Sequence, residues 1–222
     1  MGYNVIITGA SGMVGKGVLL ECLDSPQIAA VTVINRKPQD ITHPKLTELV
    51  LPDFTDSHTL ELSGFDACYF CLGVSALGLN EKQYTAITYD LALDFAKHFI
   101  KNNQQALFCY VSGAGTNAKS RTMWARVKGQ TEEDLKSMPF KKVYCFRPGF
   151  IQPLRGIQSK TGWYNAIYTV LRPIAKPLKG VFNNAITDTT ALGKAMINIL
   201  DYGWSHHTLD NRAINQLADK ES

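Results

Sequence analysis

The sequence predicts an α/β protein built on a doubly wound parallel sheet, and two observations support this fold class. From residue 3 to about residue 147, short β-branched apolar runs alternate with longer stretches of helical period. This alternation is typical of repeated strand–helix–strand units, which form parallel sheets. A glycine-rich turn also joins the first apolar run to the first helical stretch, where such sheets carry their ligand-binding loops.

Six short apolar segments are expected to form the strands, which is enough for a complete doubly wound sheet. They lie at regular intervals and are separated by polar or helical stretches. The predicted strands are Tyr3–Thr8, Ala30–Asn35, Thr47–Leu51, Ala67–Cys71, Leu107–Val111 and Lys142–Phe146.

Three helices follow from apolar residues spaced three and four apart, since this spacing places them on one helix face. The first lies between the fourth and fifth strands, the second follows the fifth strand, and the third begins at Asp188, a residue type that favours helix starts. Their apolar faces comprise, in turn, Tyr84, Ile87, Leu91, Phe95 and Phe99; Trp124, Val127, Thr131 and Leu135; and Leu192, Ala195, Met196 and Ile199.

Composition limits the class of protein. The chain has 222 residues, of which 45% are hydrophobic and 19% charged, and this describes an ordinary globular protein rather than a disordered, collagenous or disulfide-stapled one. The length predicts one domain over residues 1–222, with 149–222 as a small helical lobe on the substrate side. The net charge of +4 is scattered, so we expect no nucleic-acid partner.

The cysteines and the N-terminus indicate a cytoplasmic location. Most of the five cysteines lie in apolar runs, as in a reduced compartment. Cys68 and Cys71 point to opposite faces of a strand, and the pair His206–His207 has no further ligand at metal-binding spacing, so no metal site is expected. The start of the chain lacks a basic lead and an apolar signal core, and no uncharged run is long enough to span a membrane.

The turn that follows the first strand, TGASGMVG, predicts a dinucleotide site. Gly9 permits a tight turn, Gly12 lets a pyrophosphate approach the backbone, and Gly15 allows the helix to pack closely on the strand. The phosphates then meet the positive end of the helix. The candidate cofactor-binding residues of this turn are Gly9, Ser11, Gly12, Met13 and Val14.

The end of the second strand favours NADP over NAD. An acidic residue would accept a hydrogen bond from the ribose 2′-hydroxyl of NAD, but the chain has Asn35, Arg36 and Lys37 there. The two cations suit a 2′-phosphate, which makes NADP the expected cofactor and NAD the weaker alternative. The other interpretation is that Arg36 and Lys37 only solvate a loop.

These residues resemble the short-chain dehydrogenase/reductase superfamily, in particular its atypical branch and the Tat-interacting-protein-like oxidoreductases. The resemblance covers most of the chain. It rests on seven ordered matches, which are TGASGMVG, NRK from Asn35, Asp53-Phe54, FCLG from Phe70, VSG from Val111, WARVKGQTEE from Trp124 and FRPG from Phe146.

The resemblance implies roles for further residues. In family terms, Asp53 and Phe54 hold the adenine, and the strand end at Cys71, Leu72 and Gly73 lies along the adenine ribose. Phe54, Leu72 and Phe150 could instead belong to the core, and Asp53 could be a turn residue. The residues that the family places at the nicotinamide are Ser112, Lys128, Pro148, Gly149 and Phe150, with Ser112 and Lys128 as the candidate catalytic pair.

The chain departs from the family in its chemistry. The family uses a Tyr-x-x-x-Lys pair on one helix face, in which the lysine lowers the pKa of the tyrosine so that the phenol can transfer a proton. Trp124 stands in place of this tyrosine, and an indole cannot act as the acid or base. Gly113 follows Ser112 where many relatives have a second hydroxyl, so Ser112 either polarises a carbonyl or only supports the cofactor. Candidate substitutes for the tyrosine are Tyr89, Tyr164 and Tyr168.

Two hypotheses about function remain open. The first is an NADP-dependent oxidoreductase that acts on a small carbonyl or alcohol, with Ser112 and Lys128 retained and the acid supplied by water or another tyrosine. The second is an NADP(H)-binding protein without turnover that reports redox state to a protein partner. Residues 162–178 have an apolar helical stripe that suits a flap over the nicotinamide better than a membrane-surface helix. A homodimer is compatible with either hypothesis.

Overall fold

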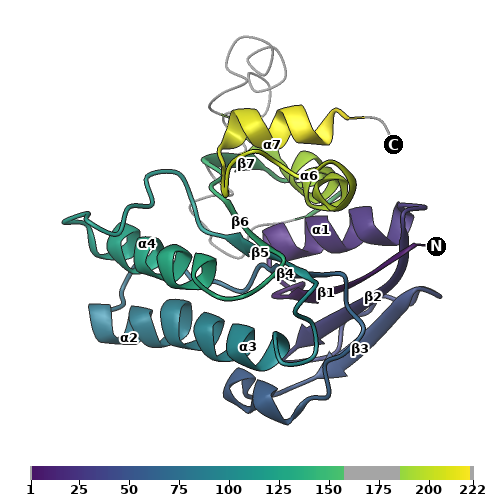
Figure 1. Ribbon diagram of the computed structural model, residues 1–222, viewed down its shortest axis with the longest axis horizontal. Coiled ribbons are helices and arrows are strands. Elements are labelled where there is room, and N and C mark those ends of the chain that lie inside the picture. Colours follow the sequence, from purple (N-terminus) through teal and green to yellow (C-terminus); the bar gives the residue numbers. More distant parts are fainter. Residues whose placement is uncertain (1, 158–185, 221–222) are drawn as a thin grey trace.

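A central parallel sheet of seven strands forms the middle layer of the protein (Figure 1). The structure, a computed structural model, describes residues 2–157 and 186–220. The strand order is β3-β2-β1-β4-β5-β6-β9, so the chain first builds outward from β1 and then returns to extend the other side. The strands are β1 (Tyr3–Thr8), β2 (Ile28–Asn35), β3 (Leu46–Val50), β4 (Ala67–Phe70), β5 (Leu107–Val111), β6 (Lys142–Phe146) and β9 (Thr208–Leu209).

Helices cover both faces of this sheet (Figure 1). One face packs against α1 (Met13–Asp24), α6 (Thr189–Tyr202) and α7 (Asn211–Ala218), with a core that includes Val5, Val33 and Met196. The other face has an aromatic core around Phe70, Phe95 and Phe108. The elements on that side are η1 (Phe54–Thr59), α2 (Glu81–Thr85), the π-helical turn η2 (Ala86–Asp90), α3 (Leu91–Phe99) and α4 (Met123–Lys136).

The predicted fold class is confirmed, and all six predicted strands are present. The sheet is larger than expected because β9 pairs in parallel with β6. In the C-terminal part, α6 packs along α1 and begins at Asp188, whose side chain accepts a hydrogen bond from the Ala191 amide. A small second sheet pairs β7 (Phe150–Gln152) with β8 (Ile186–Asp188).

The helix between β4 and β5 differs from the predicted regular stripe. Tyr84, Phe95 and Phe99 are buried as expected, but Ile87 and Leu91 are only partly buried. The π-helical turn adds a residue at this point and rotates the inward face, so that Thr88 and Ala92 take the buried positions. Sequence spacing cannot reveal such an insertion because it assumes a constant helical period.

Two glycines allow α1 and α6 to cross closely. A β-carbon on Gly17 would lie 2.6 Å from the β-carbon of Thr189, and one on Gly193 would lie 2.6 Å from the γ-carbon of Glu21. Both distances are shorter than atoms tolerate, so these positions require glycine for the helices to pack as they do.

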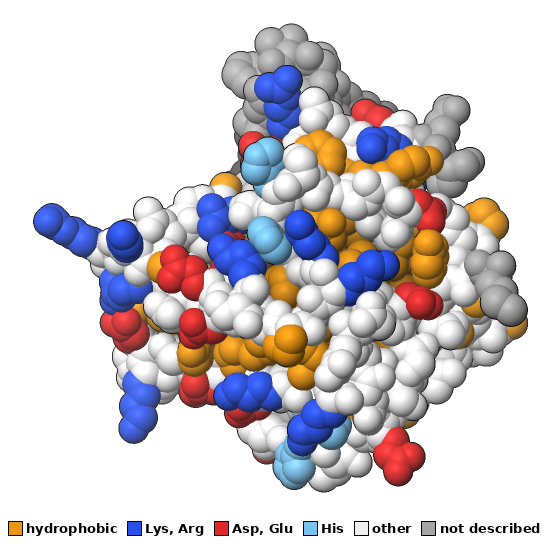
Figure 2. All heavy atoms as spheres, viewed as in Figure 1, with side chains coloured by type: hydrophobic (Ala, Val, Ile, Leu, Met, Phe, Trp, Pro, Cys, Tyr) orange, Lys and Arg blue, Asp and Glu red, His pale blue; other side chains and the backbone are white. Residues whose placement is uncertain are grey.

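The described residues agree with several expected features of the surface and interior. Cys22, Cys68, Cys109 and Cys145 are buried, and His206 and His207 are exposed. Within residues 2–157 and 186–220, no helix has the length and apolarity needed to cross a bilayer. Basic and acidic side chains are both distributed over the face seen in Figure 2. The predicted flap at 162–178, with Tyr164 and Tyr168, lies outside the described residues.

Candidate functional site

The strand order fixes where a ligand can bind. The direction of sheet growth reverses between β1 and β4, and in doubly wound folds the binding crevice lies outside the carboxyl ends of the strands at this reversal. The loops after β1 and β4 meet there, since a β-carbon on Gly9 would lie 2.7 Å from the backbone nitrogen of Leu72. Gly9 also has a φ of +72°, which favours glycine.

The glycine turn forms a cradle of bare backbone. A β-carbon on Gly15 would lie 2.3 Å from the carbonyl oxygen of Gly9, so the start of α1 packs directly on the turn. Gly12 is less crowded than Gly15, because a β-carbon built on it would meet only the carbonyl oxygen of Gly9, at 3.3 Å. Gly12 is the N-cap of α1 and supplies no side-chain cap, and the first turn has no acidic residue. This end of α1 therefore suits a phosphate group.

The remaining predicted residues of the turn lie around this cradle. Ser11 is exposed, whereas Met13 and Val14 are partly buried and pack against the core on the α1 face. The turn thus presents backbone and one hydroxyl toward solvent and anchors its apolar side chains below.

A carboxylate that the sequence analysis missed lies beside the end of β2. Asn35 is buried, and its amide donates to Oε1 of Glu48 at 2.9 Å. Glu48 lies on β3 and also accepts from the backbone nitrogen of Gln39, at 3.1 Å. Arg36 and Lys37 are exposed, and neither has an ion-pair partner within the described ranges. The end of β2 itself has no acidic residue, as the sequence shows, but the carboxylate of Glu48 reaches this point from the neighbouring strand.

Asp53 and Phe54 have local structural partners. Asp53 is exposed and caps η1, with its carboxylate accepting from the backbone nitrogen and the hydroxyl of Thr55 at 2.9 and 2.8 Å. These two hydrogen bonds hold the pKa of Asp53 below its usual value. Phe54 is buried against Phe70 and Phe95, so its ring belongs to the core.

The end of β4, which the resemblance places along the adenine ribose, lies beside the glycine turn. The backbone nitrogen of Cys71 donates to the carbonyl of Thr8 at 3.2 Å, and that of Leu72 to the hydroxyl of Thr8 at 3.4 Å. Gly73 is exposed, and a β-carbon there would meet nothing within 4 Å. Burial raises the pKa of the Cys71 thiol to about 12, which disfavours the thiolate form.

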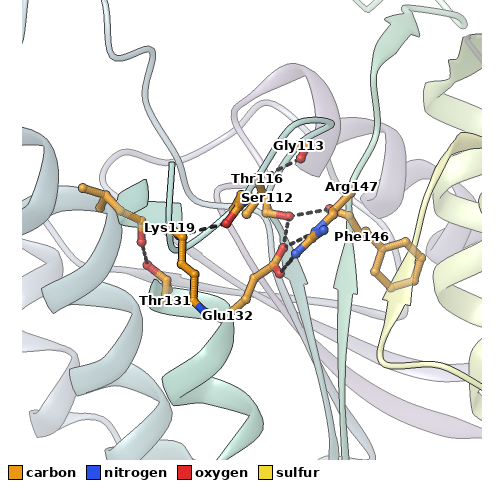
Figure 3. A network of polar contacts seen from close by, with 10 residues as sticks. Ser112, Gly113, Thr116, Lys119, Thr131, Glu132, Phe146 and Arg147 are labelled. Atoms are coloured by element: carbon orange, nitrogen blue, oxygen red, sulfur yellow. Dashed lines mark hydrogen bonds and ion pairs between the residues drawn. The ribbon is translucent and has the colours of Figure 1, made fainter. Parts of the chain in front are cut away.

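Ser112 belongs to a buried polar network rather than to an open hydroxyl site (Figure 3). Its hydroxyl donates to Oε1 of Glu132 at 2.5 Å. The guanidinium of Arg147 binds both oxygens of the same carboxylate, through Nε at 2.9 and 3.2 Å and through the terminal nitrogen at 2.5 Å. A hydroxyl has one proton to donate, so Ser112 as placed does not donate it to a substrate carbonyl.

Glu132 and Arg147 were not assigned a role from the sequence. Glu132 is 1% exposed, and the ion pair joins α4 to the segment after β6. The available signal was weak: Glu132 follows Lys128 by four residues and therefore shares its helix face, but spacing does not identify Ser112 and Arg147 as its partners.

Lys128, which the resemblance places at the nicotinamide ribose, lies next to this network. Its ammonium donates to the backbone carbonyl of Ser112 at 2.5 Å. Burial of the ammonium lowers the pKa of Lys128 to about 8, against an opposing effect from the carboxylate of Glu132. Lys128 is thus a cation at neutral pH that releases its proton close to the physiological range.

Trp124 occupies the tyrosine position and extends toward the loop after β5. A β-carbon on Gly115 would lie 3.4 Å from the indole ring. Tyr89 does not substitute for the missing tyrosine, because its hydroxyl donates to the Asp134 carboxylate. That hydrogen bond, with a smaller effect of burial, raises the pKa of Tyr89 to about 12.

The loop after β6 closes the predicted nicotinamide end. The carbonyl of Pro148 accepts from the backbone nitrogen of Ala114 at 2.9 Å, which joins the loops after β5 and β6. The backbone nitrogen of Gly149 donates to the side chain of Asn211 at 2.9 Å, and Phe150 begins β7 with its side chain partly buried.

The sheet order and the glycine turn after β1 define a doubly wound Rossmann fold, which solved short-chain dehydrogenase/reductase proteins share. A solved short-chain dehydrogenase family protein from Francisella tularensis matches with a TM-score of 0.65 and 17% identity, over 91% of this chain and 93% of that one. The Bordetella bronchiseptica enzyme WbmF, solved in complex with NAD+, matches with a TM-score of 0.68 and 12% identity, over 97% of this chain and 76% of that one.

Sequence similarity confirms the resemblance to the atypical branch and to the Tat-interacting-protein-like proteins. The protein HTATIP2 of Rattus norvegicus is 26% identical over 152 residues, which span 67% of this chain and 62% of that protein. The mitochondrial protein fmp52 of Emericella nidulans is 31% identical over 159 residues, which span 67% of this chain and 66% of that relative. No protein-family model matches the sequence.

The predicted cytoplasmic location is contradicted by these relatives. Several fungal relatives are named as mitochondrial proteins. Reduced, buried cysteines therefore did not identify the compartment, because they are equally compatible with a reducing interior elsewhere in the cell.

We expect the Glu132→Gln substitution to lower the free energy of unfolding by about 2–3 kcal/mol, because it leaves Arg147 without its counter-charge in a largely buried network. Denaturant unfolding measures the change. The matched control is Glu81→Gln, which breaks the exposed ion pair with Arg126 and should cost about 0–1 kcal/mol. Equal losses for the two variants would contradict the structural importance of Glu132.

The lowered pKa of Lys128 predicts how the stability of the protein depends on pH. Its pKa is about 8 in the folded chain and about 10.4 when unfolded, so between these values the unfolded state binds more protons and stability should rise with pH. Lys128→Met should lack this rise. Urea unfolding of both proteins from pH 7 to pH 10.5 tests it, and parallel curves would show that the lysine has an ordinary pKa.

Proposed function

We propose that this chain binds NADP(H) across the ends of β1 and β4 and is an oxidoreductase for a small carbonyl or alcohol, with an altered active site. The main support for the proposal is the glycine turn. Gly9, Gly12 and Gly15 have no side chains, so a ligand can come close to the backbone at the start of α1. Such a cradle fits a pyrophosphate, which needs close backbone approach and a helix N-terminus. The NAD+ complex of WbmF, a structural neighbour, supports the same class of cofactor.

The exposed pair Arg36 and Lys37 supports NADP as the favoured form. Both side chains stand at the carboxyl end of β2, and no ion pair with a described residue neutralises either. A 2′-phosphate would supply the negative charge that they lack.

Lys128 is the proton donor in the proposed reaction. A bound nicotinamide would supply or accept a hydride at the substrate carbon. In the reductive direction the carbonyl oxygen then needs one proton to become an alcohol. Lys128 holds a proton with a pKa of about 8, and solvent restores it afterwards. Ser112 supports the position of Lys128 through its backbone carbonyl instead of polarising the substrate.

A second candidate function is an NADP(H)-binding protein without turnover that signals redox state to a protein partner. Two observations favour it. Trp124 offers no titrating proton, and the hydroxyl of Ser112 is already bonded to Glu132. A panel of small carbonyl substrates separates the two functions, since the second requires that turnover stay at background.

Replacing Arg36 with alanine should weaken NADPH binding about tenfold and leave NADH binding within about twofold, because one cation facing the 2′-phosphate is removed. Isothermal titration with both nucleotides measures this. Arg212→Ala removes an exposed arginine from α7 and is the matched control. Equal affinity of the unmodified protein for NADH and NADPH, with no effect of Arg36→Ala, would refute the preference for NADP.

Turnover should be slow, detectable and dependent on Lys128. We expect Lys128→Met to lower NADPH-dependent carbonyl reduction at least about tenfold, and Trp124→Tyr to raise it by a similar factor because it restores a phenol four residues before the lysine. NADPH oxidation is followed by absorbance. A protein that binds NADPH but shows no turnover until Trp124 is replaced would instead support the redox-signalling function.

A further inference from the structure

Three polar residues at the end of β2 form a cluster that the proposed function does not use. Asn35 is 4% exposed, and its amide nitrogen donates to the carboxylate of Glu48 at 2.9 Å. The backbone nitrogen of Gln39 donates to both oxygens of the same carboxylate, at 3.1 and 3.2 Å. Within the described part of the chain, Oδ1 of Asn35 and Nε2 of Gln39 are buried and have no hydrogen-bond partner.

Glu48 determines how the amide of Asn35 is oriented. An ionised carboxylate can only accept hydrogen bonds, so the NH2 group of Asn35 must face it. The amide oxygen is then left as an unsatisfied acceptor, and a buried acceptor without a partner is unfavourable. Because Glu48 fixes this orientation, the oxygen of Asn35 points away from Glu48 as a free acceptor.

The cluster lies beside the proposed cofactor site. In the β1–β2 register Thr8 pairs with Ile34, so Asn35 and the first glycine of the turn each follow directly after this last pair. The carboxyl end of β2 is where doubly wound proteins distinguish a ribose 2′-hydroxyl from a 2′-phosphate. A hydroxyl can donate to the free oxygen of Asn35, whereas a phosphate cannot, and the negative charge of Glu48 opposes a phosphate further.

We propose that Glu48 is a positioning residue that limits the preference for NADP(H) by keeping Asn35 as an acceptor for the ribose 2′-hydroxyl. This inference rests on the proposed function, since it assigns a selectivity determinant to the same site. Arg36 and Lys37 favour the 2′-phosphate, while Glu48 and Asn35 favour the 2′-hydroxyl. The chain therefore retains affinity for NAD(H), and the balance between the two pairs sets the selectivity.

The test is the Glu48→Gln substitution, which keeps the size of the side chain and removes its charge. The glutamine can donate its own amide to Oδ1 of Asn35 and still accept from Gln39, so Asn35 turns over and presents NH2 as a donor. We expect the ratio of NADPH to NADH affinity, measured by isothermal titration, to increase about five- to tenfold. Glu133→Gln, an exposed change on α4 with the same loss of charge, should leave the ratio unchanged.

A second variant distinguishes a change in cofactor selectivity from a loss of structure. Asn35→Ala removes the acceptor and should weaken NADH binding more than NADPH binding, so that the ratio moves in the same direction. If Glu48 only ties the loop between β2 and β3, both affinities will change together, and an unchanged ratio in both variants overturns the inference. If the unmodified protein binds neither nucleotide, the proposed function itself fails, and the inference fails with it.

Discussion

The buried carboxylate of Glu132 is the interaction on which the arrangement around the predicted nicotinamide end depends. A charge in the interior is tolerated only when it is paired and hydrogen-bonded, and Glu132 meets this requirement through Arg147 and Ser112. These partners join α4 to the ends of β5 and β6. The same contacts orient the Ser112 backbone, whose carbonyl receives the ammonium of Lys128. The position of the lysine is therefore a consequence of how the carboxylate is satisfied.

The glycine turn after β1, at the other end of the site, depends on close backbone packing and not on charge. Gly9 and Gly15 let the first turn, the start of α1 and the loop after β4 meet at distances that a β-carbon would prevent. Glycines at 17 and 193 do the same where α1 crosses α6. The helix that would receive the phosphates is thus held from both sides by backbone contacts. Because a rigid helix N-terminus needs no rearrangement to bind an anion, such packing serves affinity as well as stability.

The fold could be predicted from the sequence because its signals are local. β-branched runs such as Leu107–Val111, and a helix start at Asp188, reflect properties of neighbouring residues. The errors have another origin. The π-helical turn in Ala86–Asp90 rotates a helix face without changing its composition, and β9 is too short to show a pattern. The contacts of Glu48 with Asn35 and of Glu132 with Ser112 join separate elements, so that only the folded chain reveals them.

In both parts of the site, a carboxylate decides what a neighbouring polar group can offer. The Ser112 hydroxyl donates its hydrogen bond to Glu132, and the Asn35 amide donates one to Glu48. Each acidic residue engages a donor of its neighbour, so that the Ser112 hydroxyl oxygen and the Asn35 amide oxygen are left as acceptors. The residue types at positions 35 and 112 therefore do not by themselves determine whether these side chains donate a hydrogen bond to a ligand or accept one from it. Recognition at these two positions has to be inferred from second partners on other elements, which explains why motif matching identified the residues but not their roles.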